Sequence, residues 1–330
     1  MAFNLRTVII GLPLLALGCA SAFAQSSSTR GITDYPTRPL RLITGFLPGG
    51  VSDTIARVIG EQLGEHLGQR VVIDGRPGAG GVLSMSIAAE ATPDGYTLYL
   101  GQPVITISRL FKNKPSFDPI AAFAPVSLIG IGPTMMTVHP SLPVNSVKEL
   151  IAYAKSQPGG LRFGSSGAGT TNHFAGELFR VMSGAPITHI PYRGAAVNVL
   201  AVVQGEIHIA FLPLLAAIPQ VKSGKLKGLA VSSAKRSQAV PDLPAVAETL
   251  PGYEVSAWYG IVVPAKTPKA AIARLDTELA KILQNPVVVR RLESQGVDVE
   301  HLNPAQFAAY IRKDAARWDK LVKDAGIKFE

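Results

Sequence analysis

The chain has 330 residues, of which 47% are hydrophobic, and a formal net charge of +9 from 32 Lys and Arg against 23 Asp and Glu. This length and apolar content predict two domains with buried cores. The basic residues are scattered rather than interleaved with aromatic residues, so a nucleic-acid-binding surface is not expected. Beyond the N-terminal segment no run of about 20 apolar residues occurs, which excludes a membrane-spanning helix there.

The first 24 residues have the pattern of a secretory signal peptide. Arg6 precedes the apolar stretch Thr7–Gly18, and Ala22 and Ala24 supply the small residues that signal peptidase requires. We expect Sec-dependent export and cleavage after Ala24; the alternative is a lipoprotein acylated on Cys19. Cys19 is the one cysteine in the chain, so a chain cleaved after Ala24 would lack disulfides and thiol chemistry. Residues 25–37 are expected to form a polar tether.

The first folded region alternates strands with helices. Strands are predicted over Leu40–Phe46, Val71–Ile73 and Tyr96–Leu100. A loop rich in small residues follows each of them, at Leu47–Gly50, Asp74–Gly81 and Gly101–Pro103. Ser52 is a candidate cap for the helix after the first loop, and Asp53 lies in the first turn of that helix.

A second alternating set begins with a helix at Val147–Ser156. Strands are expected over 161–163, Ile187–Ile190, Ile207–Leu212 and Gly228–Ser232, and helices over Ala195–Gln204 and Leu214–Ser223. The loop Phe163–Phe174 follows the first of these strands, with Thr170 or Thr171 as the cap of the next helix. Such alternation predicts an α/β fold with parallel, doubly wound sheets and a ligand crevice at the carboxyl ends of the strands.

Two long extended segments, Val126–Val138 and Tyr253–Val263, separate these sets from each other and from the C-terminal part. The last 60 residues or so are predicted to be helical, over Lys269–Leu283, Val287–Gln295 and Pro304–Lys323 with Asn303 as N-cap. Because this part has no strong strand, we expect it to pack on the first lobe.

The loops at Leu47–Gly50, Asp74–Gly81 and Phe163–Phe174 share one property. Each turns tightly before a helix, so backbone N–H groups and the helix dipole favour an anion, carboxylate or phosphate, without lysine or arginine. For any single loop, a plain strand-to-helix connection is the alternative.

The sequence matches known catalytic and metal-binding motifs poorly. A serine acylase would use Ser232–Lys235, but the partner motifs are imperfect and in the wrong order, and Ala168 interrupts a nucleophile elbow at Gly164–Ala168. A phosphate-binding lysine loop is missing. The six histidines are too dispersed to predict a metal site, and we expect no enzyme activity and no cofactor.

An ordered set of short motifs over Tyr35–Glu330 resembles the substrate-binding receptors of tripartite tricarboxylate transporters, the Bug family of periplasmic binding proteins. These motifs are Tyr35–Pro36, Arg38–Leu40, Pro48–Gly50 with Asp53, Arg76–Gly81, Pro93–Leu98, Phe163–Thr170 with His173, Pro191–Gly194, Gly224–Leu226, Pro241–Pro244 and Trp258–Gly260. The sequence departs from the family pattern at Ser84, where glycine is usual, and at His208, where an acidic residue is usual.

The resemblance implies two doubly wound α/β lobes joined by two crossings, formed by residues 38–137 plus 258–330 and by residues 138–257. It implies a periplasmic monomer that closes on a small carboxylate about hinges near Ile131–Val138 and Ser256–Val263, and then meets the membrane components of a transporter. A signalling partner in the membrane is the alternative.

The ligand-binding residues expected from the loops and the resemblance form one set. They are Phe46, Pro48, Gly49, Gly50, Asp53, Ala79, Gly80, Gly81, Gln102, Ser165, Ser166, Gly167, Gly169, Thr170, His173, Tyr192, Arg193, His208 and Phe211. A fixed charge on Asp53 would penalise dianions or favour an amine. The ligand itself stays open between dicarboxylates, tricarboxylates, amino acids and aromatic acids.

Overall fold

A computed structural model describes residues 34–45, 50–111, 114–167, 170–192 and 194–325. The predicted signal peptide and most of the tether lie outside these residues, as do Phe46, Pro48, Gly49, Gly169 and Arg193. Among the helices described, none is long and apolar enough to cross a membrane.

The first sheet begins with three parallel strands, β1 (Leu40–Thr44), β2 (Val71–Gly75) and β3 (Thr97–Gly101). Between them lie α1 (Val51–Leu67), the 3₁₀ turn η2 (Ala79–Gly81) and α2 (Val82–Ala89). β1 is buried along its apolar run, and Ile55, Ile59 and Leu63 of α1 are fully buried against it at helical spacing. The predicted parallel strands of this region are therefore confirmed.

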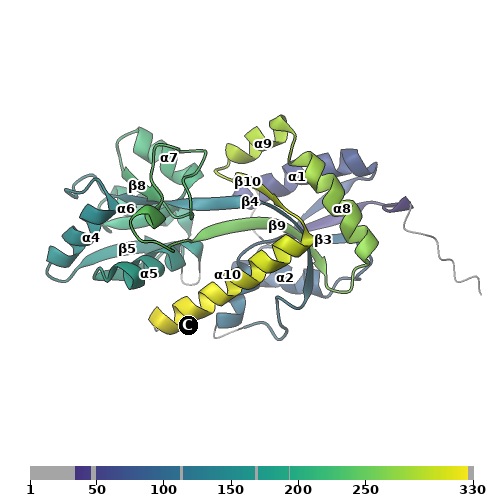
Figure 1. Ribbon diagram of the computed structural model, residues 1–330, viewed down its shortest axis with the longest axis horizontal. Helices are drawn as coiled ribbons and strands as arrows, with labels where there is room; N and C mark the ends of the chain where they lie inside the picture. The colour runs from purple at the N-terminus through teal and green to yellow at the C-terminus, as the bar shows by residue number, and fades with distance from the viewer. Residues whose placement is uncertain (1–33, 46–49, 112–113, 168–169, 193, 326–330) are drawn as a thin grey trace, which may run out of the picture. The chain divides into compact units, whose positions relative to one another are not determined.

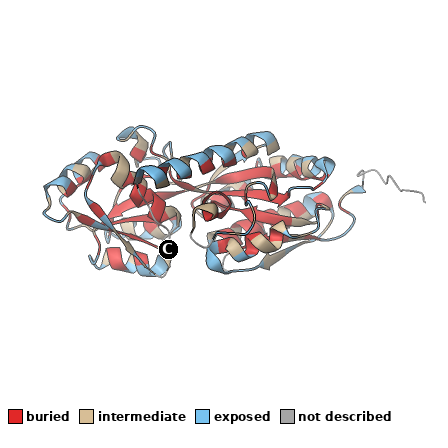
Figure 2. Cartoon of the chain, turned by 90° about the horizontal axis from the view of Figure 1, so that it is seen from below, coloured by how far each residue is buried: buried red, intermediate tan, exposed pale blue. Residues whose placement is uncertain are grey.

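The second group repeats the arrangement, with parallel strands β5 (Leu161–Ser165), β6 (Ile187–Pro191) and β7 (Ile209–Pro213). Its helices are α4 (Val147–Ser156), α5 (Thr171–Ser183), α6 (Ala195–Val203) and α7 (Leu214–Lys222), followed by strand β8 (Lys227–Val231). Figure 2 shows the buried residues along the strands and the exposed outer faces of the helices.

Two long strands connect the groups, β4 (Phe123–Val138) and β9 (Ser256–Pro264) (Figure 1). They pair antiparallel, with Ile131 opposite Trp258, and the far end of β4 pairs antiparallel with β7 and β8. The sheet is therefore mixed rather than wholly parallel. The two strands run in opposite directions because one carries the chain into the second group and the other carries it back. The predicted lobe boundaries after residues 137 and 257 fall near the ends of these strands and stay a prediction.

Short elements complete the central part of the chain. They are α3 (Val104–Ile107), η3 (Ser108–Leu110) and η4 (Val246–Glu248). α3 follows β3 directly, so it starts at the carboxyl end of a parallel strand, where a ligand crevice is expected.

The C-terminal part contains α8 (Lys269–Ile282), α9 (Pro286–Glu293), β10 (Asp298–Leu302) and α10 (Pro304–Ala325). The prediction that it holds helices alone was wrong, because β10 pairs antiparallel with β4. None of the five residues of β10 is buried, and the strand forms through its pairing with β4, which no local sequence pattern predicts. The predicted N-cap of α10 is confirmed, since Asn303 Oδ1 accepts a hydrogen bond from Gln306 N at 3.0 Å.

α10 joins both cores rather than packing on the first lobe alone. Phe307 and Ile311 pack with Trp258 in the core around β9, whereas Trp318 and Leu321 pack with Phe174 in the core of the second group. The Phe174 and Trp318 rings are 4.4 Å apart between centroids. This helix therefore packs against both groups of strands.

Candidate functional site

A cavity of about 540 Å³ is bordered by residues from both groups and from the connecting strands. Its described lining comprises Gly50, Val51, Ser52, Ala79, Gly80, Gln102, Pro103, Val104, Ile107, Phe111, Gly132, Pro133, Thr134, Ser166, Thr170, Thr171, Asn172, Ala195, Pro213, Leu214, Ala257, Tyr259, Gln295, Gly296 and Val297. The volume lies within the range of about 300–1,000 Å³ typical of small-molecule sites.

The four-residue helix α3 begins at this cavity, and so do four longer helices: α1, α5, α6 and α7. Their N-cap residues are Gly50, Thr170, Gly194 and Pro213, and no side chain caps any of these helices. α8 also lacks a side-chain cap, but its first residues do not line the cavity, and α4 and α9 are capped by Ser146 and Asn285. The first N–H groups of a helix have no partner within the helix, so these four ends provide donors and a positive potential at one place.

The loop before α2 turns through four successive residues with positive φ. Gly78, Ala79, Gly80 and Gly81 have φ values of 151°, 46°, 62° and 97°. Ala79 is the one non-glycine residue with positive φ in the described chain, a conformation that costs about 1–3 kcal/mol. Because Ala79 and Gly80 both line the cavity, this strain lies at the site itself.

The loop Ser165–Thr170 is held by hydrogen bonds of its own. Ser165 Oγ accepts from Gly167 N at 3.1 Å, Thr170 Oγ1 donates to Gly167 O at 2.7 Å, and Asn172 Nδ2 donates to Ser166 Oγ at 2.8 Å. The N–H group of Gly167 is therefore used within the loop, and the expectation that other N–H groups of this loop bind an anion stays a prediction. Thr170 is the N-cap as predicted, but its hydroxyl does not cap the helix.

Two stacked histidines lie beside this loop, and one of them contacts Ser165. The His173 and His189 rings lie 4.0 Å apart, and His189 Nε2 is 2.7 Å from Ser165 Oγ. Burial lowers the pKa of His189 to about 4, and burial together with the neighbouring His189 lowers the pKa of His173 to about 3. Both imidazoles are therefore neutral near neutral pH and add no charge to the site.

The structure brings six of the predicted ligand residues together on the cavity surface. They are Gly50, Ala79, Gly80, Gln102, Ser166 and Thr170. Gln102 Nε2 donates to Ser52 Oγ at 3.1 Å, so its carbonyl oxygen is left for another partner. Ser52 lies inside α1 and does not cap it, contrary to the sequence-based expectation.

Eight predicted residues are described but do not line the cavity: Asp53, Gly81, Ser165, Gly167, His173, Tyr192, His208 and Phe211. Asp53 accepts from Arg57 Nε at 2.9 Å, and His208 Nδ1 accepts from Arg162 N at 2.9 Å. Phe211 is fully buried in the core beside Phe179. A direct ligand role for these residues stays a prediction.

Sequence reasoning did not name one whole wall of the cavity. Pro103, Val104, Ile107 and Phe111 follow β3, and the loop Gly101–Pro103 was the one signal for them. Gln295–Val297 come from the turn between α9 and β10, and they reach the cavity through the unforeseen pairing of β10 with β4. Tyr259, on β9, also lines the cavity, and burial raises the pKa of its phenol to about 12.

Two α/β lobes connected by long strands, with a cavity at the helix N-termini, define the class of solute-binding proteins. The family model of the tripartite tricarboxylate transporter family receptor matches residues 55–327. The chain therefore belongs to this receptor family.

This chain is also similar to individual proteins in sequence and in structure. Protein BugT of Bordetella pertussis is 32% identical over 320 residues, covering 96% of this chain and 98% of its own. The structure of an R. palustris protein with adipate is 36% identical with a TM-score of 0.78, covering 90% of this chain and all of that one. MatC from Rhodopseudomonas palustris with bound malate is 28% identical with a TM-score of 0.73, covering 87% of this chain and all of that one.

Proposed function

We propose that this protein is a periplasmic receptor that binds a small carboxylate between its two lobes, leaves it chemically unchanged and delivers it to the membrane components of a tripartite transporter. The observation that carries the proposal is the convergence of four helix N-termini without side-chain caps on one cavity. Backbone donors and helix dipoles at such ends stabilise a carboxylate. The adipate and malate bound by the two structural relatives support the same ligand class.

Export and cleavage after Ala24, and a monomeric state, belong to the same proposal. The environment of Ser232, the serine that fitted the acylase pattern, supports binding without a chemical reaction. Ser232 is fully buried, and its Oγ accepts from Thr134 N at 2.8 Å and from Thr134 Oγ1 at 2.9 Å. A hydroxyl held in this way serves the β4 backbone rather than a substrate.

The proposal is tested by removing one backbone donor without disturbing its helix. Thr171 is the first residue of α5, and Thr170 before it has φ −82° and ψ 160°, which a following proline accepts. Thr171→Pro is therefore expected to fold normally and to weaken carboxylate binding by roughly tenfold or more, the loss of a hydrogen bond to a charged group. Calorimetric titration with adipate and malate measures this effect.

Two control variants distinguish the loss of the Thr171 N–H group from the loss of its side chain and from the introduction of a proline. Thr171→Ala removes the same side chain and retains the N–H group, so it should bind nearly as the parent does. Lys269→Pro places proline at the first position of α8, after Pro268 with ψ 133°, away from the cavity, and should leave binding unchanged. Equal affinities for Thr171→Pro and Thr171→Ala would contradict a role for the α5 N-terminus.

A further inference from the structure

The cavity lining combines polar and apolar side chains. Thr134, Tyr259 and Gln295 carry hydroxyl or amide groups on separate walls. Most of the hydroxyl and amide groups lie within or next to the loops and helix N-termini that would hold the carboxylate, on Ser52, Gln102, Ser166, Thr170, Thr171 and Asn172. These groups and the backbone donors beside them account for one end of a ligand. The chemical nature of the rest of the ligand is therefore determined by the other walls of the cavity.

The apolar part is continuous along the chain from β3 into α3 and beyond. Pro103, Val104, Ile107 and Phe111 form this wall, and Val104 and Ile107 are each 5% exposed. Pro213 and Leu214 at the start of α7 add apolar surface from the second group. A hydrocarbon body gains free energy against such walls in proportion to the area it buries, about 25 cal/mol per Å².

The described lining also lacks formal charge. It contains no Asp, Glu, Lys, Arg or His, and its one ionisable side chain, Tyr259, is held neutral because burial raises the pKa of its phenol. Asp53, in the first turn of α1, lies outside this lining and is paired with Arg57. An ammonium group on the ligand would lose its hydration without gaining a counter-ion among these residues, which is strongly unfavourable.

We propose that the ligand is a mono- or dicarboxylate with an unsubstituted hydrocarbon body, aliphatic or aromatic, rather than an amino acid or a tricarboxylate. The inference rests on the proposed function, because it assumes that a carboxylate occupies the polar end of the cavity. The hydrocarbon body lies along the α3 wall, between α3 and the start of α7. The volume of about 540 Å³ has room for a phenyl ring or a six-carbon chain beside the carboxylate.

Matched ligand pairs that differ by one ammonium group test the inference. Calorimetry on the full mature chain would compare 3-phenylpropionate with phenylalanine, and adipate with 2-aminoadipate, with citrate as the tricarboxylate. The unsubstituted member of each pair is expected to bind at least roughly tenfold more tightly than its amino counterpart, and citrate more weakly than adipate.

The possible results separate the two proposals. Amino acids or citrate binding as tightly as the unsubstituted acids would overturn the hydrocarbon-body inference and leave a carboxylate receptor in place. Failure of every carboxylate to bind would overturn the proposed function and the inference together.

A variant of the apolar wall gives an independent readout. Phe111→Ala should weaken 3-phenylpropionate by roughly tenfold while changing propionate little, because propionate has no ring to place there. Phe111→Leu preserves an apolar side chain and should show a smaller loss, which serves if the alanine variant folds poorly. Val287→Ala, at an exposed position of α9, is the matched control. An equal loss for both ligands would contradict contact between Phe111 and the hydrocarbon body.

Discussion

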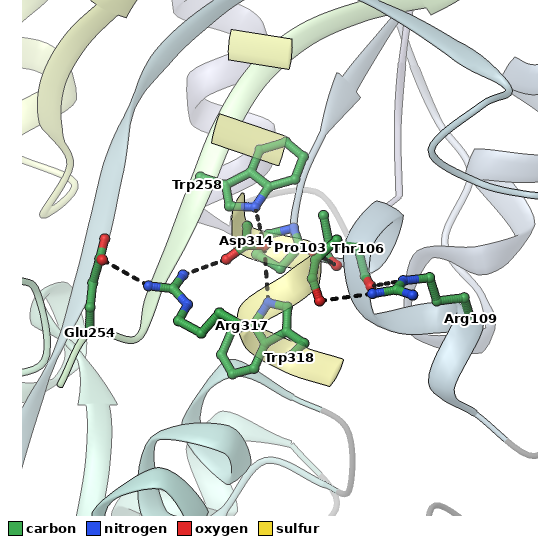
Figure 3. A network of polar contacts seen from close by, with 9 residues as sticks. Pro103, Thr106, Arg109, Glu254, Trp258, Asp314, Arg317 and Trp318 are labelled. Atoms are coloured by element: carbon green, nitrogen blue, oxygen red, sulfur yellow. Dashed lines mark hydrogen bonds and ion pairs between the residues drawn. The ribbon is translucent and has the colours of Figure 1, made fainter. Parts of the chain in front are cut away.

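The carboxylate of Asp314 and the cavity at the helix N-termini both lie inside the protein, and their polar partners differ in kind. Asp314 is 2% exposed, and its Oδ2 accepts from Thr106 Oγ1 at 2.6 Å, Trp258 Nε1 at 3.1 Å and Trp318 Nε1 at 3.0 Å. Arg317 forms an ion pair with the other oxygen and a second one with Glu254 (Figure 3). The described lining of the cavity offers neutral hydroxyl, amide and backbone groups.

This difference shows how one fold treats a permanent and a transient carboxylate. The Asp314 site uses a full set of donors and a guanidinium, which suits a group that never leaves. A receptor must release its ligand, and neutral donors bind an anion less strongly than a buried cation would. Thr106 belongs to α3, so the wall of the cavity is itself anchored to the Asp314 site.

The largest effect is expected from breaking the permanent site. Asp314→Ala would leave the Arg317 guanidinium, two indole N–H groups and the Thr106 hydroxyl without this acceptor, so the free energy of unfolding should fall by about 3–5 kcal/mol. Urea unfolding measures it. Asp324→Ala removes the exposed partner of Lys320 on the same helix and should change stability by about 0–1 kcal/mol. Similar losses in both variants would show that Asp314 is no more important than a surface ion pair.

A smaller effect is expected when the transient site is made to resemble the permanent one. Gln102→Lys places an ammonium on the cavity wall, where the Nε2 of Gln102 now meets Ser52. Without ligand, the free energy of unfolding of the variant should be about 1–3 kcal/mol lower than that of the parent, because the introduced charge has no counter-ion. A saturating carboxylate should recover this stability, and it should dissociate more slowly from the variant than from the parent protein.

Thermal unfolding with and without adipate, together with stopped-flow dissociation rates, tests this prediction. Gln102→Met is the uncharged control of similar size, and its stability should respond to ligand no more than that of the parent. If Gln102→Lys binds adipate no more tightly than Gln102→Met, the side chain at position 102 lies away from the carboxylate.

The sequence could predict features that depend on residues close together in the chain, but not those that depend on distant residues. Strand-to-helix loops are local patterns, so glycine and capping preferences were enough to select Gly50, Gly80 and Thr170, which line the cavity. Asp314 lies in a helix of ordinary composition, and its partners at Thr106 and Trp258 are distant along the chain. The residues Gln295–Val297 likewise reach the cavity through the pairing of β10 with β4. Contacts of this kind depend on the completed fold and leave no local signal.

The smallest effect is expected at Asp53, the one acidic residue that the sequence placed in the ligand site. It lies in the first turn of α1, where its negative charge partly offsets the positive helix end that borders the cavity, and Arg57 neutralises much of that charge. Asp53→Asn should therefore tighten carboxylate binding by roughly two- to threefold at low salt, an effect that screening reduces at high salt. Glu61→Gln, farther along α1 and paired with Arg291 at the surface, is the control and should have no effect. Weaker binding by Asp53→Asn, or a new preference between mono- and dicarboxylates, would instead support the contact with ligand that the sequence predicted.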